Sequence, residues 1–460
     1  MANEKILNYD ALVIGSGQGG NPLAVRLAKD GVRVALVESG LLGGTCINTG
    51  CTPTKTMVAS AQVAHYARNA GRWGVRASDI SVDLAAVVQR KNEVVERFRS
   101  GWPKQFDKKV DVYQGRARFT GVRQIEVGEH SLSAKRIFID TGAKPVIPAL
   151  DGLHSVPYLT NETLLELTQL PEHLLVLGGG YVGLEFGQMF QRFGSKVTVV
   201  HSGAQLLPNE DGDVISELQK NLEAEGMSFL LQARATSVTR QGNRIELTAK
   251  TGDGEQTLSG SHLLLATGRT PETKDLQLDR TGVEMDEKGH IVVNDRLETT
   301  APDIWALGDV TGGPAFTHIS YNDYQILYGN IYAGQSLSTR SRLVPYAVYT
   351  DPALGRVGLT EKAARAQGRK LKIGKVPMTW VARAIERAET AGLMKLVVDA
   401  ETDRVLGAAI LAAEGGELVQ ILSTLMLAEK PYTLLKGAIY IHPTLAEGFF
   451  ALMDSVKEEN

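Results

Sequence analysis

The residues best suited to chemistry are the only two cysteines of the chain, Cys46 and Cys51, in the segment Gly43-Gly-Thr-Cys-Ile-Asn-Thr-Gly-Cys-Thr-Pro-Thr-Lys55. Their spacing brings both sulfurs within disulfide range at the start of a helix, where the helix dipole stabilises a thiolate. A structural zinc site would need about four ligands, and no second Cys or His pair supplies them. We therefore predict a reactive thiol pair, with two inert buried thiols as the alternative.

Two glycine-rich segments have the spacing of dinucleotide-binding loops. Gly15-Ser-Gly-Gln-Gly-Gly20 follows an apolar run at 9–14 and opens a helical pattern at 21–29, so its backbone can meet a pyrophosphate at a helix N-terminus. Glu38 ends the next apolar run, where an acid typically binds a ribose hydroxyl. Because Gly178-Gly-Gly-Tyr-Val-Gly183 has the same context, we expect two bound dinucleotides.

The second segment differs from the first at the position of the ribose-binding acid. Its second strand ends in His201, followed by Ser202, without a carboxylate. The missing acid removes a repulsion against a 2′-phosphate, but no arginine pair stands there to bind one. The sequence therefore favours NADPH only slightly over NADH, and a site that accepts either nucleotide is the alternative.

The hydrophobic pattern predicts the elements that position these loops. Short apolar runs alternate with helical patterns in two βαβ units, as in buried parallel sheets, and alternating runs between 113 and 140 predict a β-meander in the first unit. After residue 344 the pattern becomes α+β. We predict an α/β fold with two Rossmann-like nucleotide-binding domains and a C-terminal α+β domain. The expected parts are residues 1–147 and 271–340 (first nucleotide), 148–270 (second nucleotide) and 341–460 (C-terminal domain).

Composition excludes several classes of function. Lys+Arg 49 against Asp+Glu 52 gives a net charge of -3, so no basic excess is available for nucleic acid. Apolar stretches fall far short of the ~20 residues of a membrane span, and the N-terminus lacks the features of a signal peptide. Two cysteines in 460 residues do not make a secreted disulfide framework. We predict a cytoplasmic protein that binds neither nucleic acid nor membrane.

Together these motifs resemble the class I pyridine nucleotide-disulfide oxidoreductases, the family of dihydrolipoamide dehydrogenase, glutathione reductase and mercuric reductase. The resemblance covers essentially the whole chain, and Gly43–Lys55 is its most specific part. It implies FAD on the first fingerprint and NADPH or NADH on the second. The implied FAD residues are Gly15, Gly17, Gly20, Glu38, Gly44, Thr45, Thr141, Gly142, Gly308 and Asp309. The implied NAD(P)H residues are Gly178, Gly180, Tyr181, Gly183, His201 and Gly268.

The resemblance also implies catalytic roles. Cys46 would be the thiol that meets the substrate and Cys51 the flavin-side thiol of a redox disulfide. Lys55 and Glu185 resemble an ion pair beside flavin N5, and Tyr181 resembles a gate over the nicotinamide pocket.

A base is expected beside the thiols, because disulfide exchange leaves a thiolate that must be protonated. His442-Pro-Thr-Leu-Ala-Glu447 resembles the family's His and Glu pair, in which Glu orients the imidazole. In the family this pair reaches the disulfide of the other subunit, which implies a homodimer with shared active sites. A structural histidine is the alternative.

The third domain resembles that of mercuric-reductase-like members, but the C-terminal tail carries no cysteine pair. We therefore expect an NAD(P)H:disulfide oxidoreductase acting on a small-molecule or protein-bound dithiol or disulfide, with a role in cell redox homeostasis. A metal-ion or oxidant reductase using the same cysteines is the alternative. A subunit of a multienzyme complex, and a flavin-dependent oxidase in which the disulfide is incidental, also stay open. No resident metal is expected.

Overall fold

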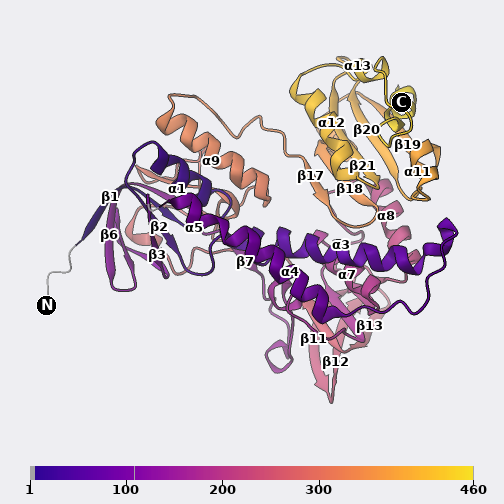
Figure 1. Cartoon of the computed structure of the whole chain (residues 1–460), viewed down its shortest axis with the longest axis horizontal. Helices are drawn as coiled ribbons and strands as arrows, with labels where there is room; N and C mark the ends of the chain where they lie inside the picture. The colour runs from indigo at the N-terminus through magenta and orange to yellow at the C-terminus, as the bar shows by residue number, and fades with distance from the viewer. Residues whose placement is uncertain (1–5, 108, 459–460) are drawn as a thin grey trace. The chain divides into compact units, whose positions relative to one another are not determined.

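The computed structural model describes residues 6–107 and 109–458, which divide into two compact units (Figure 1). Unit 1 comprises Met1–Thr56, Val88–Val146 and Gly268–Arg342, and unit 2 comprises Met57–Val87, Ile147–Thr267 and Leu343–Asn460. Each unit is assembled from three separate stretches of chain. The domain boundaries expected from the sequence stay a prediction.

Unit 1 is built on a seven-stranded sheet in the order β3-β2-β1-β6-β5-β4, with β16 also paired to β6. Pairs among β3, β2, β1, β6 and β16 are parallel, and β4, β5 and β6 form an antiparallel meander. The strands are β1 (Leu7–Ile14), β2 (Val34–Glu38), β3 (Val110–Gln114), β4 (Ala117–Gly121), β5 (Gln124–Val127), β6 (His130–Ile139) and β16 (Ile304–Ala306). A two-stranded ribbon joins β7 (Ala143–Pro145) to β15 (Arg269–Pro271).

The first alternating run, at 113–119, does not form one strand of the expected meander, because it is divided between β3 and β4. Gly115 adopts a φ of 150 between them, and the chain changes partner there. β3 lies at the parallel edge beside β2, whereas β4 pairs with β5. The meander therefore begins at Ala117.

Helices α1 (Gly20–Lys29) and α9 (Thr317–Tyr332) cover one face of the unit 1 sheet. Their apolar residues pack against Ala11, Val13 and Phe138, as the helical periodicity of 21–29 requires. The other face packs against β4, β5 and the segment 276–310. Remaining elements of this unit are α2 (Gly44–Asn48), the start of α3 (Cys51–Arg68), most of α4 (Leu84–Arg99), α5 (Gly101–Phe106), η3 (Leu278–Arg280) and η4 (Gly308–Thr311).

Unit 2 contains a second nucleotide-type sheet, parallel throughout, in the order β10-β9-β8-β14. Its elements are β8 (His173–Leu177), α7 (Tyr181–Phe193), β9 (Lys196–Val200), α8 (Gly212–Ala224), β10 (Ser228–Leu230) and β14 (His262–Leu265). An antiparallel three-stranded sheet lies between β10 and β14 in sequence: β11 (Arg234–Gln241), β12 (Arg244–Thr251) and β13 (Gly254–Gly260). Shorter elements are η1 (Ala70–Trp73), η2 (Leu153–Ser155) and α6 (Asn161–Leu164).

The C-terminal part of unit 2 is an antiparallel six-stranded sheet in the order β17-β18-β21-β20-β19-β22. The strands are β17 (Tyr346–Val348), β18 (Ala353–Gly358), β19 (Leu371–Pro377), β20 (Leu393–Asp399), β21 (Val405–Ala412) and β22 (Lys457–Glu458). The helices are α10 (Glu361–Ala366), η5 (Met378–Trp380), α11 (Ala382–Glu386), α12 (Gly415–Leu427), α13 (Thr433–Lys436) and α14 (Gly448–Asp454). The mixed α/β class, with two parallel nucleotide-type sheets and a C-terminal α+β part, is confirmed.

Within residues 6–107 and 109–458, every helix is too short or too polar to span a bilayer. The cytoplasmic location expected from the sequence stays a prediction.

A buried ion cluster ties α8 and α10 to the six-stranded sheet. Lys395 of β20 is 3% exposed, and its Nζ lies 3.2 Å from Asp211 Oδ2, 3.0 Å from Asp213 Oδ1 and 2.8 Å from Glu361 Oε2. Burying an ammonium group is costly unless carboxylates compensate its charge. Asp211 depends on this cation, whereas Asp213 also pairs with Lys375 and Glu361 also pairs with Arg365.

We expect Lys395→Met to lower the free energy of unfolding by ~3–5 kcal/mol, because the buried carboxylate of Asp211 loses its counter-charge. Lys375→Met is the matched control: its Nζ lies 2.8 Å from Asp213 Oδ2, but its side chain is 43% exposed, so the loss should stay below ~1 kcal/mol. Urea denaturation followed by circular dichroism measures both. Equal losses in the two variants would contradict the role given to Lys395.

Candidate functional site

The two cysteines lie next to each other at the junction of α2 and α3. Both are free thiols; Cys46 is half-buried and Cys51 is exposed. Cys46 lies inside the five-residue helix α2, whereas Cys51 is the first residue of the 18-residue helix α3. Cys51 Sγ lies 3.3 Å from Thr317 Oγ1 at the start of α9. The hydroxyl of Thr317, which the sequence did not single out, is therefore part of the thiol site.

The two thiols differ in acidity. A hydrogen bond with Cys51, burial, and the charge of Cys51 together raise the pKa of the Cys46 thiol far above its usual range. When the pair is reduced, Cys46 therefore holds its proton more tightly than an ordinary thiol does. Only Cys51 begins a long helix, so any stabilisation of a thiolate by a helix dipole falls on Cys51.

The first glycine loop is shaped by close backbone packing. Gly15 adopts a φ of 104, and a Cβ there would lie 2.1 Å from the carbonyl oxygen of Asp140. A Cβ on Gly20 would lie 2.2 Å from the carbonyl oxygen of Gly15. No other residue fits these positions without moving the backbone. The loop thereby presents the N-terminus of α1, as a pyrophosphate site requires.

Glu38 is already bound to this loop. Its Oε2 accepts hydrogen bonds from Ser16 N at 2.9 Å and from Ser16 Oγ at 2.5 Å, while Oε1 accepts from Gly40 N at 2.6 Å. The carboxylate is therefore held at the carboxyl end of β2, beside the fingerprint loop.

The second glycine loop repeats this geometry. A Cβ on Gly178 would lie 2.2 Å from the carbonyl oxygen of Ala266, and one on Gly183 would lie 2.1 Å from that of Gly178. Gly180, by contrast, faces open space. The two loops therefore have the same backbone arrangement, one at the start of α1 and the other at the start of α7. Tyr181, the first residue of α7, is half-buried.

His201 stands where Glu38 stands in the first fold, and like Glu38 it accepts a hydrogen bond from the glycine loop. Its Nδ1 accepts a hydrogen bond from Gly179 N at 3.2 Å, and burial lowers its pKa. The imidazole is therefore neutral at neutral pH and supplies no positive charge for a 2′-phosphate.

The turn at Gly308–Asp309 lies at the start of η4. Gly308 N donates to Asp323 Oδ2 at 2.9 Å, and Asp323 forms an ion pair with Arg342. Asp309 Oδ2 lies 3.6 Å from Arg269 Nε, and burial raises the pKa of Asp309. Asp323 and Arg342 were missed by sequence reasoning, because nothing in their spacing relates them to this turn.

The structure brings His442 and Glu447 together. His442 Nδ1 lies 2.9 Å and 3.0 Å from the two carboxylate oxygens of Glu447. This contact leaves Nε2 as the ring atom available to other groups, and the His442 side chain is 66% exposed.

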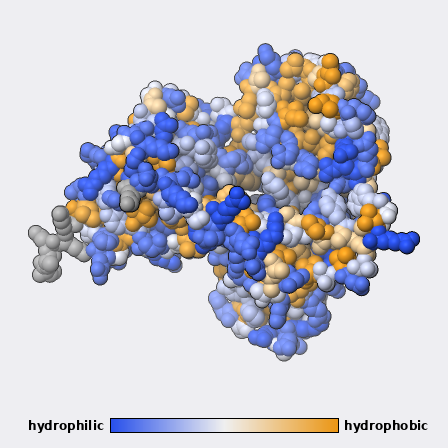
Figure 2. All heavy atoms as spheres, in the orientation of Figure 1, coloured by the Kyte–Doolittle hydropathy of each residue, from blue (hydrophilic) through white to orange (hydrophobic). Residues whose placement is uncertain are grey.

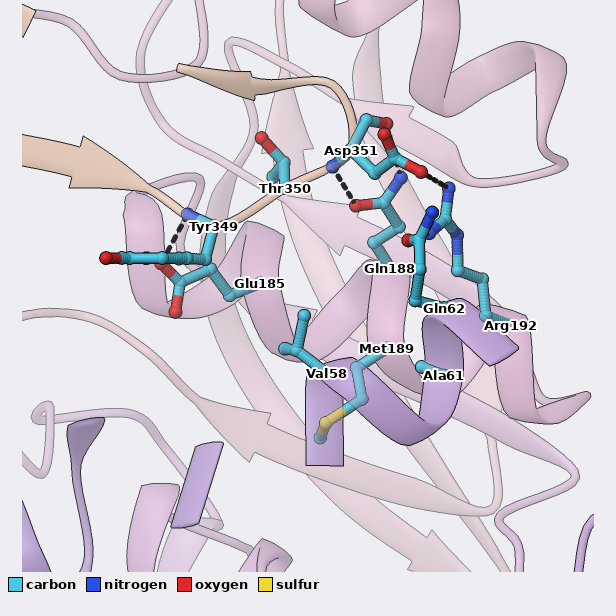
Figure 3. Close-up of a pocket in the computed structure, with 10 residues that line it drawn as sticks. All are labelled: Val58, Ala61, Gln62, Glu185, Gln188, Met189, Arg192, Tyr349, Thr350 and Asp351. Atoms are coloured by element: carbon cyan, nitrogen blue, oxygen red, sulfur yellow. Dashed lines mark hydrogen bonds and ion pairs between the residues drawn. The ribbon is translucent and has the colours of Figure 1, made fainter. Parts of the chain in front are cut away.

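Glu185 belongs to a polar stripe on one face of α7 (Figure 3). Glu185, Gln188 and Arg192 are spaced at i, i+3 and i+7, so they share a face. Glu185 Oε1 accepts from Tyr349 N at 2.8 Å, and Gln188 forms two 2.8 Å hydrogen bonds with the backbone of Asp351. The stripe therefore holds the segment between β17 and β18.

The stripe lines a pocket of about 80 Å³ with an apolar floor, which is room for a few water molecules and not for a nucleotide. The lining residues are Val58, Ala61, Gln62, Glu185, Gln188, Met189, Arg192, Tyr349, Thr350 and Asp351. Beside it, His65, Glu225 and Asp351 offer atoms close enough for a metal ion. Arg192 Nη2, at 2.5 Å from Glu225 and 2.7 Å from Asp351, already compensates both carboxylates.

Lys55 and Glu185 fall in different units, so their pairing stays a prediction. The remaining expected nucleotide residues lie at loop positions: Gly44, Thr45, Thr141, Gly142 and Gly268.

The residues around the first loop fit FAD. The tightly packed glycines leave the loop backbone without side chains, and the buried polar atoms of Asn21 and of Thr141 Oγ1 lack a partner among the described residues. Such atoms call for a polar group from a ligand. The loop backbone, Glu38 and the Gly308–Asp309 turn would hold the dinucleotide.

The sequence matches two family models. Residues 9–323 match "Pyridine nucleotide-disulphide oxidoreductase", and residues 344–452 match its dimerisation domain.

Three relatives show the range of the family. The probable pyridine nucleotide-disulfide oxidoreductase RclA of Escherichia coli is 38% identical over 98% of this chain and 99% of that protein. A mercuric reductase of Lysinibacillus sphaericus is 34% identical over 96% of this chain and 81% of that protein. A dihydrolipoyl dehydrogenase of Thermus scotoductus is 34% identical over 98% of each.

A solved structure, described as the HOCl-induced flavoprotein disulfide reductase RclA from Escherichia coli, has a TM-score of 0.90 and 38% identity over 98% of this chain and 100% of that chain. The same RclA has also been solved as a Cu(II) complex. With a paired glycine-loop architecture, adjacent thiols and matches over nearly its full length, this chain belongs to the pyridine nucleotide-disulphide oxidoreductase family.

Proposed function

We propose that this flavoprotein oxidoreductase is an NAD(P)H:disulfide oxidoreductase whose electrons reach a dithiol or disulfide substrate through Cys46 and Cys51. The observation that carries the proposal is the adjacent thiol pair, in which Cys46 lies half-buried beside Cys51 and has a raised pKa. FAD and NAD(P)H, the cofactors of this family, supply a two-electron path between nicotinamide and thiols. In this assignment residues 1–147 and 271–340 bind FAD, 148–270 bind NAD(P)H and 341–460 form the dimer interface.

The chain's own groups account for the thiol chemistry. Cys46, as thiolate, attacks one sulfur of a substrate disulfide, and the sulfur that leaves takes a proton from His442. Cys51, as thiolate, then attacks Cys46 in the mixed disulfide, which releases the second substrate sulfur as a thiolate and forms the Cys46–Cys51 disulfide. The high pKa of Cys46 explains why a base such as His442, oriented by Glu447, is needed.

The remaining roles follow from the family resemblance. Lys55 and Glu185 are proposed as the ion pair beside the flavin, and Tyr181 as the gate over the nicotinamide. We propose only a weak preference of the second nucleotide site for NADPH over NADH, because neutral His201 neither repels a 2′-phosphate nor pairs with it.

We also propose a homodimer in which His442 and Glu447 serve the thiols of the other subunit. The match to a dimerisation domain supports this assembly. So do exposed apolar residues on the C-terminal part of unit 2, where Figure 2 shows a hydrophobic surface. These residues are Ile421, Leu427, Leu434, Ile439, Ile441 and Phe450. Ile439 and Ile441 are 100% and 79% exposed and directly precede His442.

A metal-ion or oxidant reductase is the second candidate. It is favoured by relatives described as mercuric reductases and by the Cu(II) complex of RclA. Adjacent thiolates bind soft cations such as Hg(II) and Cu(I). The chain has no third cysteine, so the same two thiols would have to bind and reduce the ion.

We expect Cys51→Ser to lower disulfide turnover by more than about a thousandfold while FAD stays bound, because a mixed disulfide on Cys46 could no longer be resolved. Lipoamide turnover with NADPH and with NADH, together with the flavin absorbance, measures both effects and the nucleotide preference. Unchanged turnover would refute the proposal. Loss of Hg(II) or Cu(II) reduction, with no disulfide turnover in the wild type, would favour the second candidate.

His442→Ala should slow the thiol half-reaction by about 10²–10⁴-fold, because a positioned proton donor is lost. Flavin reduction by NAD(P)H should keep its rate. Stopped-flow absorbance separates the two half-reactions. Equal losses in both would assign His442 a structural role.

Mixed dimers test the shared site. If Cys46→Ser and His442→Ala subunits exchange freely, half of the dimers pair one of each, and each mixed dimer holds one intact site. Roughly a quarter of the wild-type activity should return. No recovery, with subunit exchange verified by native mass spectrometry of tagged subunits, would place His442 and the thiols in the same subunit.

A further inference from the structure

The two nucleotide folds of this chain correspond residue by residue. Gly15 corresponds to Gly178, and Asp140 corresponds to Ala266, because the carbonyl oxygens of Asp140 and Ala266 face these two glycines. The backbone N–H of Asp140 donates to Ile14 O at 2.7 Å, and that of Ala266 donates to Leu177 O at 2.8 Å. The second fold forms with a methyl group at this position. The fold itself therefore does not require the carboxyl of Asp140.

The Asp140 carboxyl lies between two backbone segments of the FAD site. Its Oδ2 accepts a hydrogen bond from Gly20 N at 2.7 Å, at the start of α1. A Cβ on Gly17 would lie 2.8 Å from Oδ2, and one on Gly308 would lie 2.8 Å from Oδ1. The carboxyl thus bridges the fingerprint loop and the turn that leads to Asp309.

The surrounding charges are unfavourable for a carboxylate at this place. The negative charges of Asp309 in η4 and Asp323 in α9 both disfavour ionisation of Asp140. Each of these neighbours has a guanidinium partner, Arg269 and Arg342 respectively. Among residues 6–107 and 109–458, no basic side chain pairs with Asp140, which is buried. Burial, the largest cause, together with the two acids raises the pKa of Asp140 well above its usual range and outweighs the backbone hydrogen bonds from Gly20 and Gly19, which lower it.

FAD adds a further negative charge to this environment. A dinucleotide places its pyrophosphate at the N-terminus of the fingerprint helix, and Asp140 already binds that end of α1 through Gly20. Two anions at one helix start repel each other in a buried site. A neutral carboxylic acid keeps the hydrogen bond to Gly20 and removes this repulsion.

We propose that Asp140 is a positioning residue that holds the FAD fingerprint loop as a neutral carboxylic acid, so that FAD binding is linked to one proton. Bound FAD stabilises the protonated form, and ionised Asp140 weakens FAD binding. As the pH rises above the pKa of Asp140 in the FAD-free protein, the affinity for FAD should fall by up to about tenfold per pH unit. The affinity should stop falling once the pH exceeds the pKa that Asp140 has in the FAD-bound protein.

The first test is infrared difference spectroscopy of the FAD-loaded protein at neutral pH. Wild type should show the carbonyl band of a protonated carboxylic acid, and Asp140→Asn should lack it. Absence of the band from wild type, or its persistence in Asp140→Asn, would overturn the proposal. This readout does not involve turnover, so failure of the proposed disulfide reductase activity would leave it unaffected.

The second test measures release of FAD on dilution of the holoprotein, by FAD fluorescence, between about pH 6 and about pH 9. Wild type should release more FAD as the pH rises, and Asp140→Asn should lose this dependence. If Asp140→Asn does not fold, Asp140→Ala serves instead. Alanine is the residue that the second nucleotide fold has at the corresponding position, Ala266. Asp10→Asn removes a surface carboxylate 2.7 Å from Lys135 and should keep the wild-type profile. Equal slopes in wild type and both Asp140 variants would refute the proton linkage.

Discussion

Close packing of two backbones is the constraint on which the rest of this structure depends. At Gly15 and at Gly178 the chain passes so near Asp140 and Ala266, the residues that follow β6 and β14, that no Cβ fits. This approach turns the chain from a buried strand directly into a helix whose free N–H groups point at the carboxyl end of the sheet. The two nucleotide sites are therefore properties of backbone geometry, and side chains only adjust them.

The thiols take their place from the first of these loops. Gly43 N donates to Ser16 O at 3.2 Å, and a Cβ on Gly44 would lie 2.9 Å from the Cα of Gly17. The segment that carries Cys46 and Cys51 is thus packed onto the fingerprint loop itself. One local contact sets both the nucleotide cradle and the redox pair, which explains why a short stretch of sequence carries so much of the chemistry.

Buried charges hold unit 2 together around its nucleotide-type sheet. Arg192 joins α7 to the segment before β18 through Asp351, and Lys395 joins β20 to α8 and α10. Each cation serves several carboxylates, so neither can be removed without leaving a buried charge. Such clusters give little net stability compared with apolar packing, but they fix one arrangement of the elements that carry Glu185 and Tyr349.

The sequence by itself determined the α/β class, the two glycine loops, the thiol pair and the family, because each depends on local periodicity or on short spacings. The limits of the strands were less well determined: the run at 113–119 is divided at Gly115, where the chain changes its pairing partner, and β6 begins at His130, well before the alternating residues near 136. Only the tertiary structure decided which carboxyl groups lie close together around the FAD loop. Asp140, Asp309 and Asp323 are remote in sequence, and the burial that raises the pKa of Asp140 exists only when the sheet and α9 enclose it. The acidity of Cys46 and the turn of His201 toward Gly179 likewise depend on packed neighbours, which spacing alone does not reveal.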